Sequence, residues 1–422
     1  FMLNAPFNGG THLPDVTVVT PVFDDQKPIF YVASRGHHAD IGGKTPGSAP
    51  PDSRHIEEEG VVIDNFKMID GGEFREQATR DLLASGKYPC RNINDNMADL
   101  AAQVAANETG AREVGKMIDQ FGLQTVHAYM RHVQDNAEEC VRRVIDALKD
   151  GSFEYELDNG EFMRVAVRVD HDTRSAEIDF TGTATNEFNY NAPLAVCHAV
   201  VLYVFRTLVG APIPLNEGCF KPLKIIAPEG SMVNAQYPSA VIAGNTEVSQ
   251  LACNTLMLAL GAMAGSQATM NNYVWGNDRI QNYETICGGT GAGPGFDGCS
   301  AVQTHMTNTR GTDPEVLEHR FPVRLEEWSI RRGSGGKGAN TGGDGITRRM
   351  RFFEEMTVTT LCSHRRIAPF GAQGGAPGEV GQEWIERVNG DRISHKGNDQ
   401  NIVHPGDVFV MNTPGGGGYG QK

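Results

Sequence analysis

"GGTHLPDVTVVTPVFDDQKPIFYVASRGHHAD", residues 9–40, decides how the fold begins. Two runs rich in β-branched and aromatic residues, "VTVVTPVF" and "PIFYVASRG", flank the polar turn "DDQKP", a pattern that predicts a β-hairpin. Pairing of the two strands brings together the ends that carry His12 and Asp15 on one side and His37 and His38 on the other. The hairpin therefore predicts that the two polar stretches meet.

The first of these stretches has the chemistry of a metal site. Imidazole and carboxylate groups are preferred ligands of Zn²⁺, Mn²⁺ and Fe²⁺. His12 and Asp15 are separated by Leu-Pro, and Pro14 stiffens the loop between them, so both ligands could be preorganised. HxxD is nevertheless short and common. On these residues alone, a His that caps a turn and an Asp that begins a strand explain the pattern better.

The second stretch changes that balance because it adds two adjacent histidines. In an extended strand His37 and His38 point to opposite faces, so one can ligate a metal while the other faces a substrate. His38 and Asp40 share a face and are predicted to form an imidazole–carboxylate pair suited to proton transfer. A core imidazole and a structural Asp are the alternative. Arg35 offers a bidentate donor for an anion.

Two glycine-rich stretches further along the chain allow a backbone to approach a ligand closely. The stretch 283–298 and the segment after it carry the polar candidates Glu284, His305 and Asn308, although a mobile surface loop and a strand explain them as well. The stretch 330–345 resembles a phosphate-binding loop in isolation, but no helix follows it, so that interpretation is weak. We find no nucleotide-binding motif in the chain.

Hydrophobic periodicity predicts an α+β fold with a mixed strand/helix N-terminal part, a helical block and a β-rich C-terminal part. The predicted regions are a strand/loop segment that carries the candidate site, the helical block, an α/β middle region and the β-rich C-terminal region: 1–65, 66–151, 152–299 and 300–422.

The helical block is expected to be a long antiparallel helix pair with stops at Gly122 and Gly151, serving as scaffold or subunit interface. Two further helices are predicted near 194–209 and 247–265. In "AGNTEVSQ", Asn245 or Thr246 is expected to cap the second of them.

Composition excludes several classes of function. The formal net charge of −15 disfavours nucleic-acid binding. No uninterrupted apolar run approaches the ~18 residues of a membrane helix. Eight cysteines without a CxxC pair, and no signal peptide, indicate a reduced, cytoplasmic protein. Fifty glycines in 422 residues, well above the ~7% average, require many tight turns and close backbone approaches.

A series of longer motifs, in order from Leu3 to Gly420, resembles the hydantoinase B / 5-oxoprolinase family. The resemblance is strongest to the B-type subunit of ATP-dependent hydantoinases and lactamases, which is related to subunits of acetone and acetophenone carboxylases. Members of the family begin with a further segment, so a chain that starts at Phe1 is expected to be shorter than the natural one. The motifs include "NAPFNGGTHLPDVTVVTPVF", "ASRGHHADIGGKTPGSAPP", "NEGCFKPLKIIAPEGSMVNA", "AGNTEVSQ", "YETICGGTGAGPGFDG", "HMTNTR" and "TPGGGGYG".

The resemblance implies a division of labour between two subunits. ATP and Mg²⁺ are expected in an A-type, actin-like partner, which activates the substrate by phosphorylation, and not in this chain. The family's metal ligands fall on His12, Asp15 and His37, and the ion is divalent: Mn, Zn or Mg. His38 or Asp40 would move the proton. The expected substrate contacts are Arg35, Glu284, His305 and Asn308.

The leading expectation is therefore a hydrolase of C–N bonds in cyclic amides, with hydantoin, 5-oxoproline or a lactam as substrate, working in a hetero-oligomer. One alternative is a subunit of an ATP-dependent ketone carboxylase. The other is a non-catalytic scaffold for the ATPase partner.

Overall fold

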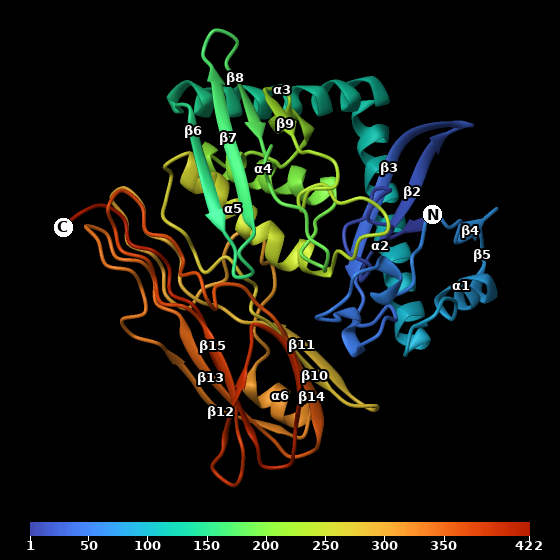
Figure 1. Ribbon diagram of the computed structural model, residues 1–422. Coiled ribbons are helices and arrows are strands. Elements are labelled where there is room, and N and C mark those ends of the chain that lie inside the picture. Colours follow the sequence, from blue (N-terminus) through green and yellow to red (C-terminus); the bar gives the residue numbers. More distant parts are fainter.

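The predicted hairpin opens the chain in the computed structural model, which describes residues 1–422 (Figure 1). Strand β2 (Asp15–Asp24) pairs antiparallel with β3 (Lys27–His37), and β1 (Met2–Leu3) adds to the other edge of β2. The register places Asp15 directly opposite His37. Val16 and Val18 are buried on the opposite face, as the period-two alternation of a strand requires.

Helix α2 (Ile93–Phe121) covers the buried face of the hairpin. Its Gln103 amide donates to the carbonyl of Val16 over 2.9 Å and to that of Ser34 over 3.2 Å, and Asn107 donates to Val18. These amides add a second hydrogen bond to backbone oxygens of the hairpin and so fix α2 against it. The shorter elements of this N-terminal unit are η1 (Pro46–Ser48), η2 (Ile56–Glu58), β4 (Ile69–Asp70), β5 (Glu73–Phe74) and α1 (Glu76–Leu83).

The middle unit is a four-stranded sheet packed on helices, with the largest core of the molecule between them. The strand order is β6-β7-β8-β9, with only the β8–β9 pair parallel. Its strands are β6 (Gly151–Glu156), β7 (Phe162–Asp170), β8 (Ser175–Asp179) and β9 (Leu223–Ile226), and its helical segments are α3 (Leu123–Ala147), α4 (Leu194–Val209), η3 (Glu217–Phe220), η4 (Gly244–Val248) and α5 (Ser249–Ala259).

The C-terminal unit consists of two antiparallel sheets with a shared core. The first has the order β11-β10-β14-β17, formed by β10 (Asn272–Gly276), β11 (Gln281–Thr285), β14 (Met356–Leu361) and β17 (Asn398–Val403). The second has the order β12-β13-β18-β15-β16, formed by β12 (Val323–Ile330), β13 (Ile346–Phe352), β15 (Gln382–Glu386), β16 (Arg392–His395) and β18 (Val408–Asn412). Helix α6 (Pro314–Arg320) precedes β12.

The α+β class is confirmed, and so are the helix at 194–209 and the β-rich C-terminal part. The expected antiparallel helix pair is wrong. Helices α2 and α3 meet at Gly122 and then diverge (Figure 1), so α2 joins the core beneath the hairpin and α3 joins the core of the middle unit. Periodicity gave two amphipathic helices but carried no information on which core each one faces. The four region boundaries remain predictions.

The glycine-rich stretches form one layer beside the sandwich. In this glycine layer, backbone packs directly on backbone: Gly416 donates to Gly343, Gly343 to Thr290 and Gly417 to Gly265, over 2.8–2.9 Å. Figure 1 shows the corresponding orange and red segments running side by side near the C-terminus. The close backbone approaches expected from composition are therefore made within the protein. The segments of the layer are 264–267, 289–293, 334–343, 369–378 and 414–420.

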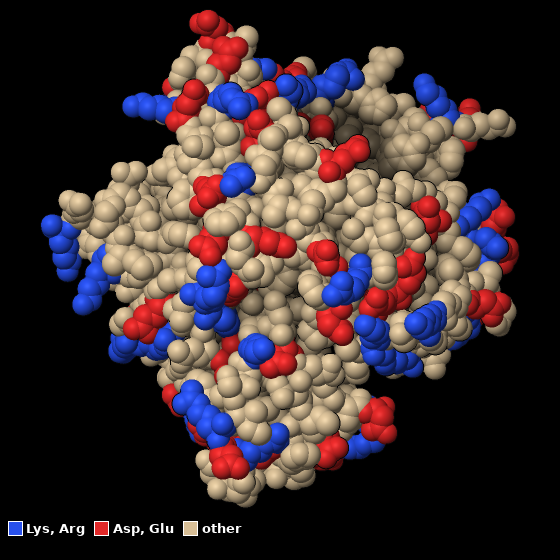
Figure 2. Space-filling view, viewed as in Figure 1, with Lys and Arg blue, Asp and Glu red and all other residues tan.

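None of the helices combines the length and the apolar character that crossing a bilayer requires. On the face shown in Figure 2, positive and negative side chains are intermixed, and a hollow of mostly uncharged atoms opens beneath α3.

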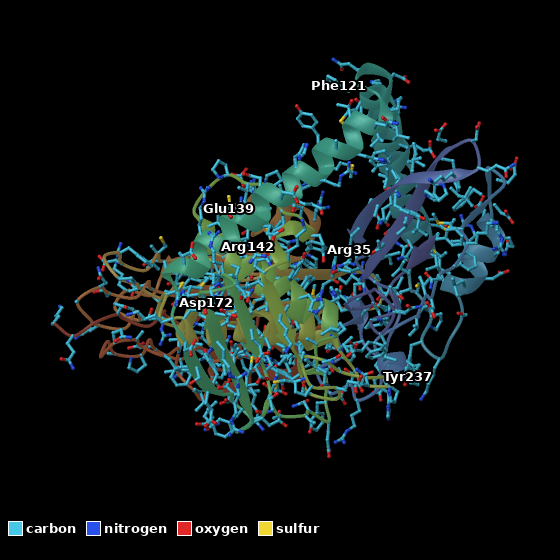
Figure 3. All side chains as sticks on the ribbon, turned by 90° about the horizontal axis from the view of Figure 1, so that it is seen from above. Arg35, Phe121, Glu139, Arg142, Asp172 and Tyr237 are labelled. Atoms are coloured by element: carbon cyan, nitrogen blue, oxygen red, sulfur yellow. The ribbon has the colours of Figure 1, made fainter.

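Apolar side chains line a groove of about 630 Å³ at the α2–α3 corner, where Figure 3 shows Phe121. The exposed members are Met117, Phe121, Tyr129, Met130 and Val133.

Replacement of Gly416 by Ala tests the glycine layer. An added Cβ would lie 1.8 Å from the carbonyl oxygen of Thr290, and its nearest neighbours are all backbone atoms, which cannot turn away as a side chain would. We expect Gly416→Ala to lower the free energy of unfolding by at least about 2 kcal/mol, measured by denaturant titration. Gly115→Ala is the control, since Gly115 lies in α2 with no atom within 4 Å of the new Cβ. It should stabilise the protein by up to ~1 kcal/mol. Equal effects of the two changes would contradict the packing.

Candidate metal centre

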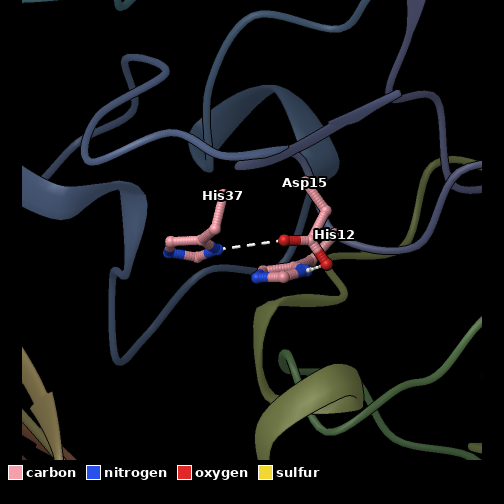
Figure 4. Close-up of side chains that lie close together, drawn as sticks. All are labelled: His12, Asp15 and His37. Carbon is pink, nitrogen blue, oxygen red and sulfur yellow. Dashed lines mark hydrogen bonds and ion pairs between the residues drawn. The ribbon is translucent and has the colours of Figure 1, made fainter. Parts of the chain in front are cut away.

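Three side chains from the two ends of the hairpin converge (Figure 4). Nδ1 of His37 lies 3.0 Å from Oδ1 of Asp15, and Nδ1 of His12 lies 3.3 Å from Oδ2 of the same carboxylate. Potential ligand atoms of all three residues lie within 4.8 Å of one another. The hairpin register causes this convergence, because it sets Asp15 opposite His37 while His12 precedes the strand by one tight turn.

The three side chains differ in their contact with solvent. The side chain of His12 is only 6% exposed, that of Asp15 is 18% exposed and that of His37 is 43% exposed. Burial alone would raise the pKa of the Asp15 carboxyl, but the charge and hydrogen bonds of His12 and His37 hold this pKa well below its usual range. Asp15 is therefore an anion at any physiological pH, and the cluster attracts a cation.

Asn245 completes the cluster from a distant part of the chain. Its amide nitrogen lies 2.6 Å from Nδ1 of His12 and 3.2 Å from Oδ2 of Asp15, so it orients both groups. Asn245 belongs to η4, a π-helical turn that leads into α5, and such turns are frequent at functional sites. The expectation that Asn245 or Thr246 caps a helix is wrong, because neither η4 nor α5 has a side-chain cap.

A small cavity of about 20 Å³ adjoins the cluster. The ring of Tyr283 closes one side, with its centroid 5.9 Å from that of His37. The Tyr283 hydroxyl donates to Oδ1 of Asn272 over 2.7 Å. Residues from all three units thus meet here, and the lining is made up of His12, Pro14, His37, Gly47, Ala49, Ile242, Thr246, Asn272, Tyr283 and Leu361.

His38 and Asp40 lie elsewhere and do not pair with each other. His38 is buried on the opposite face of the strand from His37, as predicted, between Asn96 and Gln103 of α2. Burial lowers its pKa. Asp40 accepts hydrogen bonds from Arg91 and from the backbone of the 42–47 loop. The expected proton-transfer pair is thus not formed, since each partner is engaged in holding α2 and this loop in place. Their catalytic roles have no geometric support.

The four expected substrate contacts are also separated. Arg35 lies on the same face of β3 as His37, two residues away, and is exposed without a carboxylate partner (Figure 3). Glu284 is buried in an ion pair with Arg348 over 2.7 Å, inside the C-terminal sandwich. Because neighbouring residues of a strand face opposite sides, it is Tyr283, and not Glu284, that reaches the cavity.

His305 and Asn308 do not line the cavity either. Nε2 of His305 lies 2.8 Å from the Oδ1 atom of Asn254 in α5, and burial lowers the pKa of His305 to about 4. Asn308 is exposed. Of the predicted substrate contacts, only Arg35 lies beside the cluster. Asn245 and Tyr283 were missed, and the one signal for them was their presence in the long motifs.

The donor set fits a divalent transition metal. Two imidazole nitrogens and one carboxylate oxygen are a set used by zinc, manganese and non-haem iron, and three protein ligands leave positions open for small molecules. The distances between the donors would allow one ion to contact all three. His12, Asp15 and His37 are therefore the residues that would hold it, with Asn245 behind two of them.

Comparison with known proteins assigns the chain to a family. The family described as Hydantoinase B/oxoprolinase matches residues 1–422, and the protein belongs to this family. A 5-oxoprolinase of Dictyostelium discoideum is 42% identical over 432 residues, which cover 99% of this chain and 34% of that protein. The chain thus spans about a third of the length of the curated 5-oxoprolinases that it matches.

Two solved structures share the fold. The ATP-dependent caprolactamase from Pseudomonas jessenii superposes with a TM-score of 0.87 at 23% sequence identity. The match covers 100% of this chain and 77% of the caprolactamase chain. A nucleotide-free acetone carboxylase also gives a TM-score of 0.87, at 16% sequence identity. That match covers 100% of this chain and 64% of the acetone carboxylase chain. At these identities the likeness extends to the fold alone.

A buried carboxylate ties the segment before η4 to the N-terminal unit. Glu59 accepts hydrogen bonds from the backbone nitrogens of Val241 and Ile242, each over 3.0 Å, and from the hydroxyl of Ser53 over 2.8 Å. Burial raises its pKa to about 7, against the opposing effect of these donors. Ile242 lines the cavity, so Glu59 helps to place the wall of the candidate metal centre.

The raised pKa of Glu59 predicts a pH-dependent stability. Because the ordinary value of 4.5 applies to the unfolded chain, the unfolded state loses this proton first as the pH rises. The contribution of Glu59 to the free energy of unfolding should fall between about pH 4.5 and pH 7, by roughly 3 kcal/mol. Glu59→Gln should remove this part of the slope in denaturant titrations across that range. The exposed Glu57→Gln is the control, and an unchanged slope in Glu59→Gln would refute the assignment.

The contacts of Asn245 predict a role in metal affinity. Asn245→Ala keeps all three donors but leaves His12 and Asp15 free to turn, so we expect the affinity for Mn²⁺ or Zn²⁺ to fall by about 10- to 100-fold. Isothermal titration calorimetry on the purified protein measures this. Asn389→Ala, in an exposed turn, should bind as the wild type does. Equal affinity in Asn245→Ala and wild type would show that the amide does not orient the ligands.

Proposed function

We propose that the chain is the B-type component of an ATP-dependent cyclic amide hydrolase, which opens a hydantoin, 5-oxoproline or lactam ring at a divalent metal. The observation that carries the proposal is the convergence of His12, Asp15 and His37 within 4.8 Å. Membership of the Hydantoinase B/oxoprolinase family and the similarity to 5-oxoprolinases and a caprolactamase support the reaction class.

Each residue has a distinct part in this proposal. Asp15 supplies the negative charge and His12 a buried, oriented nitrogen, while the more exposed His37 faces the approach to the site. A divalent ion, when bound, polarises a carbonyl group and makes a nucleophile available from water at neutral pH. Arg35, unpaired on the face of His37, would attract a negatively charged group on the activated substrate.

The proposal also requires a partner. No nucleotide-binding motif occurs in the chain, so ATP and Mg²⁺ are assigned to an A-type, actin-like component in a hetero-oligomer. The apolar groove at the α2–α3 corner is a surface of the kind that another protein covers. A cytoplasmic location, expected from unpaired cysteines, belongs to the same proposal.

A ketone carboxylase subunit is the second candidate, because the acetone carboxylase fold matches as well as the caprolactamase fold. Bicarbonate separates the two reactions. With the A-type partner, ATP and substrate present, a hydrolase opens 5-oxoproline without bicarbonate, whereas a carboxylase consumes ATP only when bicarbonate and a ketone are supplied.

The decisive experiment combines metal analysis with ring opening. We expect elemental analysis of the complex to find about one divalent ion per chain, and His12→Ala and His37→Ala each to lower ring opening by at least about 100-fold. His319→Ala is the control, since His319 lies in α6 outside the cluster. Full ring-opening activity in either cluster variant would refute the metal centre. A complex with the partner but without metal or turnover would favour a scaffold role.

A further inference from the structure

The cavity at the metal cluster is too small for a cyclic amide. Its volume of about 20 Å³ is close to that of a single water probe, whereas a five-membered lactam has several heavy atoms. A substrate must therefore occupy other space before or during its approach.

Two larger cavities adjoin each other between the middle and C-terminal units, and together they are called the cleft. The inner cavity has a volume of about 210 Å³ and the outer one about 800 Å³. Asp158, Asn159 and Asn398 line both, so the two cavities share a border, and the outer one is called the mouth of the cleft. The inner volume is sufficient for a small ring.

The inner cavity neighbours the metal pocket. Three segments contribute residues to both linings, with different residues in each: the loop 47–51, the helical segment 246–251 and the strand end 361–363. Glu247 belongs to this shared wall and is fully buried. Its Oε1 accepts from the amide of Asn272, which lines the metal pocket, while its Oε2 has no hydrogen-bond partner.

The mouth of the cleft carries two cations that form no ion pair, although Glu386, itself paired with Arg349, lies opposite Arg392 in the sheet. Arg365 and Arg366 are paired, with Glu383 and Glu156 respectively. Arg392 and Lys396 form no ion pair, in a chain whose formal net charge is −15. The guanidinium of Arg392 stacks on Trp384 with its carbon 3.7 Å from the ring centroid, which holds the charge at the mouth.

The inner cavity complements an amide ring. Polar groups on its wall can donate and accept hydrogen bonds, and apolar side chains among them can contact ring carbons. The lining also contains two carboxylates that are already engaged: Glu156 is paired with Arg366, and Asp158 accepts from the backbone nitrogens of Arg365, Arg366 and Ile367. The other polar members are Asn159, Asn186, Asn189, Tyr190, Ser363, His364 and Asn398, and the apolar ones include Leu157, Phe188, Leu251 and Ile367.

We propose that this cleft binds an anionic cyclic amide, with the ring in the inner cavity and the anionic group, a carboxylate or a phosphoryl group, at Arg392 and Lys396. This inference rests on the proposed function, to which it adds a substrate class and a holding site. The wall that contains Glu247 separates the bound ring from the metal cluster, so transfer between the two requires this wall to move.

Tryptophan fluorescence gives a local readout of binding. The chain has only three tryptophans, and Trp384 lies at the mouth of the cleft. We expect 5-oxoproline to change the fluorescence of the full chain in complex with its partner, and Trp384→Phe to abolish this change. Pyrrolidin-2-one, the same ring without the carboxylate, should bind at least tenfold more weakly. Equal binding of the two rings would overturn the anionic class.

Variants that remove a positive charge test whether Arg392 and Lys396 bind the anionic group. Arg392→Gln and Lys396→Gln should each weaken 5-oxoproline binding at least tenfold at unchanged melting temperature, while Lys149→Gln, an exposed lysine without an ion pair, should not. Wild-type binding in both cleft variants would overturn the proposal. Competition by inorganic phosphate at lower concentration than 5-oxoproline would support the cleft and assign its anion as phosphoryl.

A variant of the metal cluster distinguishes a failure of the cleft proposal from a failure of the proposed ring-opening reaction. His37→Ala should retain 5-oxoproline binding at the cleft even where ring opening is lost, and loss of that fluorescence change in His37→Ala would overturn a separate holding site. If ring opening never occurs but binding depends on Arg392 and Lys396, the proposed reaction fails while the cleft stands.

Discussion

The pairing of Asp15 with His37 across the first hairpin is the constraint on which the candidate site depends. A slip of one residue in a strand moves every side chain to the other face, so the cluster exists only in this register. The register is held from the opposite face, where Val16 and Val18 are buried and α2 donates amide hydrogen bonds to the hairpin backbone. Packing on one face of the hairpin thus determines the chemistry on the other.

The second requirement is that η4 reaches the hairpin from the middle of the chain. Gly244 lets it approach closely, since an added Cβ would lie 2.1 Å from the carbonyl oxygen of Asn191. Glu59 fixes the preceding residues from the N-terminal side, and Glu247 is bound to Asn272 at the start of the C-terminal sandwich. Asn245 is therefore placed by contacts with all three units.

Local patterns in the sequence were enough to predict one half of this arrangement. His12, Asp15 and His37 belong to one hairpin, so alternation and a turn signal bring them together without knowledge of the remaining fold. Asn245 and Tyr283 are brought to the same place only by tertiary packing, which no local pattern encodes. Glu284 illustrates the limit, because a strand alternates faces and only the observed sheet decides that Tyr283 points to the cavity and Glu284 to the core.

The glycine-rich stretches were ambiguous for a different reason. Glycine permits close approach of a backbone to anything, so the sequence cannot distinguish a ligand from a second backbone. Here the partner is backbone, and the layer has a mechanical consequence. The loop after α5 is bound into it through Gly265, which donates to Phe370 and accepts from Gly417. Helix α5 is thereby anchored at its end by the glycine layer and at its start by the wall of the metal pocket. Because α5 also lines the inner cavity through Leu251, a shift of this helix would act on both cavities at once.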